Sequence, residues 1–325
     1  MKILVTGGAG YIGSHIVNMA KLKNFDVTIL DNFSTGNISF VKDCEILNID
    51  LLDSNNVERL FNKRKFDYVI HLAAKSDVAE SIINPKFYYM NNVVGSLNLV
   101  NSMIKNDMND IIFSSSAAIY GNPDTSKVLE NSKKNPINPY GSSKLIVERF
   151  LKNLTDSYSF NSLSLRYFNV GGANILDKIG ELRNKENHVI PILLKSILSN
   201  NKKFKINGDK YKTKDGTCIR DYIHVDDLVD AHFKGICYLN KSRRFQEINL
   251  GSGLGFSIYE IIDSAKRVTN TNVNSTVVQP RRGDPDMLVA DIQRAKNELD
   301  WVPKKDIDSI ISSSWEWLKF CSNIK

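Results

Sequence analysis

The sequence predicts an α/β protein with a doubly wound parallel sheet and a second, smaller α/β domain. Two observations predict this class. Short β-branched runs alternate with longer amphipathic segments through the first half, and a glycine-rich turn follows the first run. Alternation of this kind is typical of parallel strands joined by right-handed crossovers. The chain has 325 residues, 42% of them hydrophobic, so it can bury a substantial core.

Six runs are expected to form the strands of this sheet. They span residues 2–6, 26–30, 45–49, 68–73, 110–115 and 162–167. One helix is expected from about Ser14 to Leu22. A second begins at Asn84, an N-cap that Pro85 follows at the first helical position, and continues to about Lys105. Its buried face is expected to include Tyr88, Asn91, Gly95 and Leu99.

The character of the chain changes after Asn169. A Gly171-Gly172 pair, a polar loop and irregular segments rich in Asn, Gly and Lys follow. We therefore expect a first domain over residues 1–170 and a second over 171–325. Runs within about 220–250 suit the first sheet, so the chain is expected to return to it there.

Gly7, Gly10 and Gly13 lie between the first strand and the first helix, where a dinucleotide-binding turn must lie. Such a turn needs a tight bend at Gly7, close approach of a pyrophosphate near Gly10, and close packing of helix on strand at Gly13. The alternative is a plain glycine-rich turn, in which Gly13 would weaken the helix for no gain. The spacing favours a dinucleotide site.

The second strand ends in Asp31, at the distance from Gly13 expected of a carboxylate that accepts both ribose hydroxyls of the adenosine. A 2′-phosphate would meet that negative charge, and the next three residues offer no arginine to receive it. Asp31 therefore favours NAD over NADP. The simpler alternative is a solvated turn aspartate.

Tyr140 and Lys144 are four residues apart, just downstream of a Phe113-Ser-Ser-Ser116 run that is expected to end a buried strand. Residues at this spacing share one helix face. A lysine held there can stabilise the phenolate of Tyr140 and make it a usable general base. Together with the dinucleotide turn, the pair predicts a hydride-transfer enzyme.

The composition disfavours other classes. The net charge of +7 comes from dispersed lysines without a basic stripe interleaved with aromatics, so no nucleic-acid partner is expected. No run approaches the roughly 20 apolar residues of a membrane span, since Pro191 and Lys195 interrupt the most apolar segment. No secretory leader is recognisable, and a cytoplasmic location is expected.

The cysteines show no CxxC spacing and the histidines no HExxH spacing. Neither disulfides nor a bound metal are expected from such a pattern. The residues are Cys44, Cys218, Cys237, Cys321, His15, His71, His188, His224 and His232.

Further motifs run along essentially the whole chain. They are TGGAGYIGSH from Thr6, HLAA from His71, YYMNNVVGSLNLV from Tyr88, SSSAAIYG from Ser114, NPYGSSK from Asn138, LRYFNVGGA from Leu165, DGTCIRDYIHVDDL from Asp215, NLGSGLGFS from Asn249 and PRRGDP from Pro280. With them the sequence resembles the UDP-hexose 4-epimerase family of the extended short-chain dehydrogenases/reductases. The resemblance implies a Rossmann NAD-binding domain, a UDP-hexose substrate and a homodimer formed through helices around 92–105 and 144–153.

The resemblance also implies roles for individual residues. Tyr140 would take the proton from the sugar 4-hydroxyl as hydride leaves C4, Lys144 would lower the pKa of Tyr140 and bind the nicotinamide ribose, and Ser116 would hydrogen-bond O4. The cofactor site would comprise Gly7, Gly10, Tyr11, Ile12, Gly13, Asp31, Asn32, Asp50, Leu51, Leu72, Ala73, Ala74, Asn91, Ser114, Tyr140, Lys144 and Tyr167. The UDP-sugar site would comprise Ser116, Tyr140, Asn169, Asn187, Val189, Arg220, Tyr222, Arg282, Asp284 and Leu288.

The implied reaction inverts C4 in three steps. Oxidation gives a flat ketone, the 4-keto sugar rotates, and hydride returns to the other face. UDP-glucose and UDP-galactose are the implied pair. UDP-GlcNAc and UDP-GalNAc stay open, because Leu288 at the wall of the sugar pocket is neither a small residue nor a tyrosine.

The sequence departs from the family pattern in the spacing of its last arginines, and two alternative functions remain open. Arg281 and Arg282 stand one residue closer to Asp284 than the family spacing, and Arg282 is preferred for the diphosphate. Ser116-Ala117-Ala118 lacks the acid pair of the related 4,6-dehydratases. A UDP-uronate epimerase is a weaker alternative. A non-catalytic NAD and nucleotide-sugar binding protein is the other, but such a protein has no use for a poised phenolate.

Overall fold

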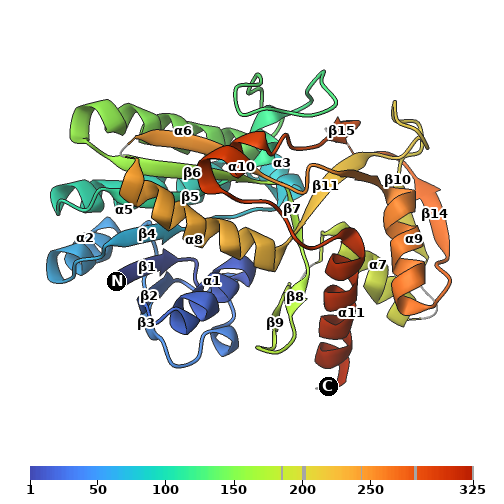
Figure 1. Ribbon diagram of the computed structural model, residues 1–325, viewed down its shortest axis with the longest axis horizontal. Coiled ribbons are helices and arrows are strands. Elements are labelled where there is room, and N and C mark those ends of the chain that lie inside the picture. Colours follow the sequence, from blue (N-terminus) through green and yellow to red (C-terminus); the bar gives the residue numbers. More distant parts are fainter. Residues whose placement is uncertain (184–185, 200–202, 243, 282–283, 324–325) are drawn as a thin grey trace.

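The computed structural model describes residues 1–183, 186–199, 203–242, 244–281 and 284–323. Its centre is a seven-stranded sheet in the order β12-β6-β5-β4-β1-β2-β3, in which every neighbouring pair is parallel (Figure 1). The strands are β1 (Lys2–Thr6), β2 (Asp26–Asp31), β3 (Glu45–Asn48), β4 (Tyr68–His71), β5 (Asp110–Ser116), β6 (Asn161–Tyr167) and β12 (Phe245–Leu250).

Helices cover both faces of this sheet because its strands alternate apolar side chains between the two faces. Ile3 and Val5 pack with α1 (Tyr11–Leu22) and α8 (Val225–Lys241), whereas Leu4 packs with the opposite layer. That layer contains α2 (Ser54–Lys63), α5 (Gly95–Lys105) and α6 (Pro139–Tyr158). Alternation along a strand buried on both sides gives this division.

The second half builds smaller sheets beside the first. β11 (Ile219–His224) pairs with β7 (Asn169–Gly171), β13 (Gly255–Ser257) and β15 (Met287–Leu288). Two-stranded sheets join β10 (Phe204–Asn207) to β14 (Ser275–Val278), and β8 (Ala173–Asn174) to β9 (Ile179–Gly180). Besides α8, the helices in the described residues of this half are α7 (Val189–Leu198), α9 (Ile258–Thr269), α10 (Gln293–Leu299) and α11 (Ile307–Asn323).

The six predicted strands and the parallel sheet are confirmed, and the first helix begins three residues earlier than expected. The expected continuous helix to Lys105 is wrong. It is divided into α4 (Pro85–Tyr88), a π-helical segment η2 (Tyr89–Val94) and α5, and α3 (Val78–Ile83) precedes it. Short 3₁₀ turns η1 (Ile38–Phe40) and η3 (Ala117–Tyr120) complete the elements.

The second half is also more regular than its composition indicated, since its described residues contain five helices, α7 to α11. Within about 220–250, β12 joins the large sheet and α8 packs on it, while β11 belongs to the smaller sheet. Among the described residues, the helices are all too short or too polar to cross a membrane.

Candidate active site

The glycine turn is closed tightly between β1 and α1. Gly7 has a φ of +70°, and a Cβ there would lie 2.7 Å from the backbone N of Ala73. A Cβ on Gly13 would lie 2.2 Å from the carbonyl O of Gly7. Gly10 is the N-cap of α1 and has no side chain that could cap the helix. The N–H groups of the first helical turn are therefore available to bind an anion. The turn therefore fits the pyrophosphate of a dinucleotide.

Asp31 is a buried residue at the carboxyl end of β2, not a solvated turn aspartate. Its Oδ2 accepts from the Ala9 N–H at 3.0 Å and its Oδ1 from the Phe33 N–H at 2.8 Å. At the end of the neighbouring strand, Asn32 Nδ2 donates to Asp50 Oδ2 at 2.9 Å. These bonds fix a carboxylate beside the glycine turn, where an adenosine ribose must lie if the pyrophosphate sits on that turn.

Leu72, Ala73 and Ala74 follow β4 and line the other side of the glycine turn, as the close approach of Gly7 to Ala73 shows. Behind them, His71 Nδ1 lies 2.7 Å from Thr6 Oγ1 and Nε2 lies 2.8 Å from Ser96 Oγ. Burial, and then the charge of Lys144, lower the pKa of His71 to about 3. His71 is thus neutral near pH 7, and its two ring nitrogens link β4 to β1 and to α5.

The π-helical segment η2 places two asparagines differently. Asn92 is buried, accepts from the Lys75 N–H at 2.8 Å and donates to Ser143 Oγ at 3.1 Å, so it ties the loop after β4 to α6. Asn91 is half-buried and donates to Asn92 Oδ1 at 3.0 Å. The extra residue of a π turn changes which side chain faces the core, and here Asn92 is buried while Asn91 is half-buried.

Tyr140 and Lys144 lie in the first turns of α6. Asn138 caps the helix by accepting from the Gly141 N–H at 2.8 Å, and Pro139 occupies its first turn. Lys144 is 3% exposed; its Nζ donates to the Ser114 carbonyl at 2.6 Å and lies 4.9 Å from the centre of the Phe113 ring. Burial lowers the pKa of Lys144 to about 7, against the opposing charge of Glu148.

The Tyr140 phenol lies beside Ser116. Burial raises the pKa of Tyr140, while hydrogen bonding by Ser116 and the charge of Arg183 lower it. Ser116 ends β5 and its Oγ accepts from the Ala118 N–H at 3.2 Å. The structure thus brings Ser116 and Tyr140 together. That Lys144 lowers the pKa of Tyr140 stays a prediction, because the Lys144 ammonium is bonded to the Ser114 carbonyl.

Tyr167 ends β6, opposite Ser116 of β5 in the sheet. Its hydroxyl lies 2.6 Å from His232 Nε2, and His232 Nδ1 lies 2.8 Å from the Leu228 carbonyl. Since only a protonated Nδ1 can bond a carbonyl, a neutral His232 accepts the Tyr167 hydroxyl proton at Nε2. Tyr167 is thereby fixed at the carboxyl edge of the sheet.

Four of the predicted substrate residues, Asn169, Arg220, Tyr222 and Leu288, lie on the small sheet. Asn169 on β7 stands opposite Tyr222 on β11, and its Nδ2 donates to the Asp221 carbonyl at 2.9 Å. Arg220 donates from Nη1 to the Ile219 carbonyl at 2.8 Å, while its Nη2 is buried without a hydrogen bond, 3.7 Å from Asp284 Oδ1. A buried donor of this kind calls for an acceptor, such as a phosphate oxygen.

The other predicted substrate residues that the structure describes lie in different parts of the fold. Leu288 on β15 stands in register with Arg220 on β11. Val189 begins α7, and Asn187 just before it donates to Asp77 Oδ2 at 2.8 Å while its own Oδ1 is buried without a partner. Arg282 lies outside the described residues.

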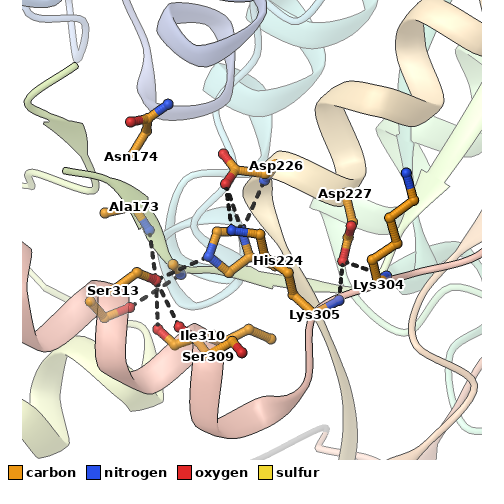
Figure 2. A network of polar contacts seen from close by, with 12 residues as sticks. Ala173, Asn174, His224, Asp226, Asp227, Lys304, Lys305, Ser309, Ile310 and Ser313 are labelled. Carbon is orange, nitrogen blue, oxygen red and sulfur yellow. Dashed lines mark hydrogen bonds and ion pairs between the residues drawn. The ribbon is translucent and has the colours of Figure 1, made fainter. Parts of the chain in front are cut away.

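A polar network joins β8, β11, the start of α8 and α11 within this half (Figure 2). His224 at the end of β11 lies 3.0 Å from Ser313 Oγ of α11 through Nε2 and accepts from the Asp226 N–H at 3.0 Å through Nδ1. Ser313 Oγ also accepts from the Ala173 N–H at 3.2 Å. One residue before, Tyr11 of the glycine turn donates to the Gly172 carbonyl at 2.6 Å. The glycine turn and the small sheet are therefore linked through the Gly172–Ala173 backbone.

One cluster has the composition of a metal site. Glu181, Glu186 and His188 offer ligand atoms within 4.8 Å of one another. Arg183 Nε lies 2.6 Å from Glu181 and Lys195 Nζ 3.3 Å from Glu186. Both carboxylates are thus already paired with cations, and the expected absence of a metal stays a prediction.

Sequence reasoning did not identify two residues behind the site, Asn92 and Glu148. Asn92 was hidden because a helical pattern cannot reveal a π turn. Glu148 could have been found, since it continues the spacing of four residues that links Tyr140 to Lys144.

Comparison with known proteins agrees with this geometry. The model of the NAD dependent epimerase/dehydratase family matches residues 3–251. A UDP-glucose 4-epimerase of Lactobacillus helveticus is 42% identical over 321 residues, covering 98% of this chain and 97% of that protein.

Two solved structures are similar over their whole length. A UDP-glucose 4-epimerase from Stenotrophomonas maltophila, with bound NAD and formylated UDP-arabinopyranose, matches with a TM-score of 0.96 at 33% identity and 100% coverage of both chains. The UDP-Glc/GlcNAc 4-epimerase of Campylobacter jejuni matches with a TM-score of 0.86 at 39% identity, covering 98% of this chain and 99% of that one. This chain belongs to the NAD dependent epimerase/dehydratase family and, within it, to the UDP-glucose 4-epimerases.

Proposed function

We propose that the chain interconverts UDP-glucose and UDP-galactose by oxidation and reduction at C4, with NAD as a bound cofactor. The observation that carries the proposal is the placement of Ser116, Tyr140 and Lys144 at the carboxyl edge of the sheet, beside a glycine turn. Ligands of open parallel sheets bind at this edge. Bound at this turn, NAD would supply the hydride-accepting and hydride-donating chemistry needed at C4.

The cofactor residues divide between the ends of several strands. Gly7, Gly10 and Gly13 would hold the pyrophosphate, with the N–H groups of Tyr11 and Ile12, and Asp31 would accept the ribose hydroxyls. Around them the proposed site is completed by Asn32, Asp50, Leu51, Leu72, Ala73, Ala74, Asn91, Ser114 and Tyr167.

The proton at O4 is assigned to Tyr140 and Ser116. Because burial raises the pKa of Tyr140, the group is a phenol at neutral pH in this structure, the form that donates a proton during reduction. Deprotonation during oxidation requires positive charge nearby, and the Lys144 ammonium, one helical turn away, would supply part of it.

The UDP moiety is assigned to the small sheet. Arg220 presents a buried Nη2 without a hydrogen bond, which suits a diphosphate oxygen. Tyr222, Asn169, Asp284, Asn187 and Val189 would complete the site, with Arg282 as a second guanidinium. We assign residues 1–170 with part of 220–250 to NAD and the remainder of the chain to the UDP-sugar.

Sugar range, assembly and location complete the proposal. Leu288 beside Arg220 would form one wall of the sugar pocket, and its intermediate size leaves UDP-GlcNAc and UDP-GalNAc as additional substrates to test. A homodimer is supported by exposed apolar side chains on η2 and α6, including Tyr89, Met90 and Ile146. The free cysteines suit a reducing cytoplasm.

The test is NMR observation of product when purified protein, without added NAD, receives UDP-galactose in one tube and UDP-N-acetylgalactosamine in another. We expect conversion of UDP-galactose, because tightly held NAD is carried through purification. If protein that contains NAD converts neither sugar, the proposal is overturned. UDP-uronates would then be assayed, and failure there would favour a non-catalytic binding protein.

A further inference from the structure

We propose that Glu148, gripped by Arg166, is a positioning residue of the hydride-transfer site. It holds the face of α6 that carries Tyr140 and Lys144 against β6, and it supplies the negative charge that the buried Lys144 faces along its own helix. This inference deepens the proposed function and rests on it.

The three side chains form a stripe on one face of α6. Tyr140, Lys144 and Glu148 follow one another at spacings of four residues, so they lie one helical turn apart. Lys144 and Glu148 are each only 3% exposed. A buried ammonium is costly unless an anion compensates it, and the stripe places one a single turn away.

Arg166 fixes the position of that anion. It lies on β6, is 1% exposed, and contacts both carboxylate oxygens of Glu148, from Nε at 2.9 Å and from Nη2 at 2.8 Å. Its Nη1 donates to Tyr120 Oη and to the Glu130 carbonyl, each at 2.8 Å. With the guanidinium held on three sides, the Glu148 carboxylate cannot swing, and a two-pronged contact of this kind fixes geometry as well as charge.

Among the groups around Lys144, Glu148 is the one whose charge favours the ammonium form. His71 on β4 has a pKa of about 3 and is neutral near pH 7. β5 contributes the Phe113 ring and the Ser114 carbonyl, which carry no charge, and Tyr140 is the preceding member of the stripe. Burial lowers the pKa of Lys144 to about 7, and Glu148 is the group that opposes this fall. Glu148 therefore favours the ammonium form that the site needs.

A purely structural clamp between α6 and β6 is the alternative. It predicts that a Glu148 variant loses stability, but it predicts no change in the titration of Lys144. The measurement that separates the two is the protonation midpoint of Lys144, read by NMR of protein with ¹³C at lysine Cε. The Lys144 signal is assigned from its absence in Lys144→Met.

We compare Glu148→Gln with Glu247→Gln in the NAD-containing protein. Glu247 on β12 also approaches Arg166, at 3.9 Å, but its side chain is 21% exposed and it lies off the stripe. In Glu148→Gln we expect the Lys144 midpoint to fall by about one pH unit, and the alkaline limb of the pH–rate profile to move with it. Glu247→Gln is expected to leave both unchanged.

An unchanged Lys144 midpoint in folded Glu148→Gln would overturn the proposal. If that variant does not fold, Glu148→Asp keeps the charge but shortens the reach to Arg166. It should keep the parent midpoint and lower kcat at unchanged KM, and unaltered kcat would contradict the positioning role. The NMR titration needs no turnover, so a shifted midpoint in a protein without epimerase activity would remove the proposed function alone.

Discussion

Lys144 donates to the Ser114 carbonyl, and so the ammonium is anchored to the strand that also carries Ser116. The phenol of Tyr140 has Ser116 as its hydrogen-bond partner. In the proposed mechanism this division separates Tyr140, the group that would move the proton, from Lys144, the group that would adjust the pKa of Tyr140. Removal of the phenol hydroxyl should therefore affect the chemical step alone.

Tyr140→Phe is expected to lower kcat by about 10³-fold, within the range for loss of a general acid–base group, while the Kd for UDP stays close to the parent value. Product formation by NMR and UDP binding by calorimetry measure the two effects. Tyr158→Phe is the matched control, since Tyr158 ends the same helix and is exposed. A Tyr140→Phe protein with near-parent turnover would contradict the assignment.

At the scale of elements, the turn from β1 to α1 separates two demands on glycine. Gly13 is required by packing, because a Cβ there would lie 2.2 Å from the Gly7 carbonyl O. Gly10 is less crowded, since a Cβ would have 3.2 Å to the same atom. In the proposed site the remaining demand on Gly10 comes from the pyrophosphate.

Gly13→Ala should destabilise the protein by about 1–3 kcal/mol, the range for overpacking, with a lower urea midpoint. Gly10→Ala should keep a near-parent midpoint and weaken NAD binding, measured as the NAD retained after gel filtration. Equal losses of stability in the two variants would show that packing alone requires both glycines.

The same elements show how far the sequence could predict the fold. The buried strands were predictable because each is a short β-branched run bounded by turns. The π segment η2 was not, since one extra residue in a helix leaves no hydrophobic signal. The helix α9 was available in principle: Ser257 and Glu260 form a capping box that precedes an apolar run. β8 and β9 have two residues each and depend on tertiary contacts.

The candidate site was predictable for a similar reason and to a similar extent. Gly7, Asp31 and Tyr140 could be predicted because a dinucleotide-binding turn fixes the spacing of Gly7, Gly13 and Asp31, and a shared helix face fixes that of Tyr140 and Lys144. The contact of Tyr11 with Gly172 joins residues 161 positions apart, and no local pattern contains it. The partner of Arg220 is likewise a matter of how β11 meets the segment around Asp284.

At the scale of the whole molecule, the two halves are joined around buried histidines. His15 lies on α1 and His224 at the end of β11, whereas His71 ends β4 of the large sheet and His232 lies on α8, which packs on that sheet. Burial lowers the pKa of all four, to about 3 for His71 and about 4 for His224 and His232. In the unfolded chain the histidine pKa is about 6.5, so the unfolded state binds more protons as the pH falls below that value.

Acid should therefore destabilise the fold between about pH 6.5 and 4, by about 1.4 kcal/mol per pH unit for each such histidine. The buried carboxylates Asp221 and Asp227 act in the opposite direction, because burial raises the pKa of each. The contribution of one histidine is isolated by comparing parent with His232→Gln in urea from pH 7 to 5. The stability difference should shrink as the pH falls, because the variant lacks one group that only the unfolded chain protonates. Tyr167→Phe breaks the same hydrogen bond but keeps the histidine. The difference in unfolding free energy between this variant and the parent should therefore stay nearly constant from pH 7 to 5. If that difference is also constant for His232→Gln, the assignment to His232 is refuted.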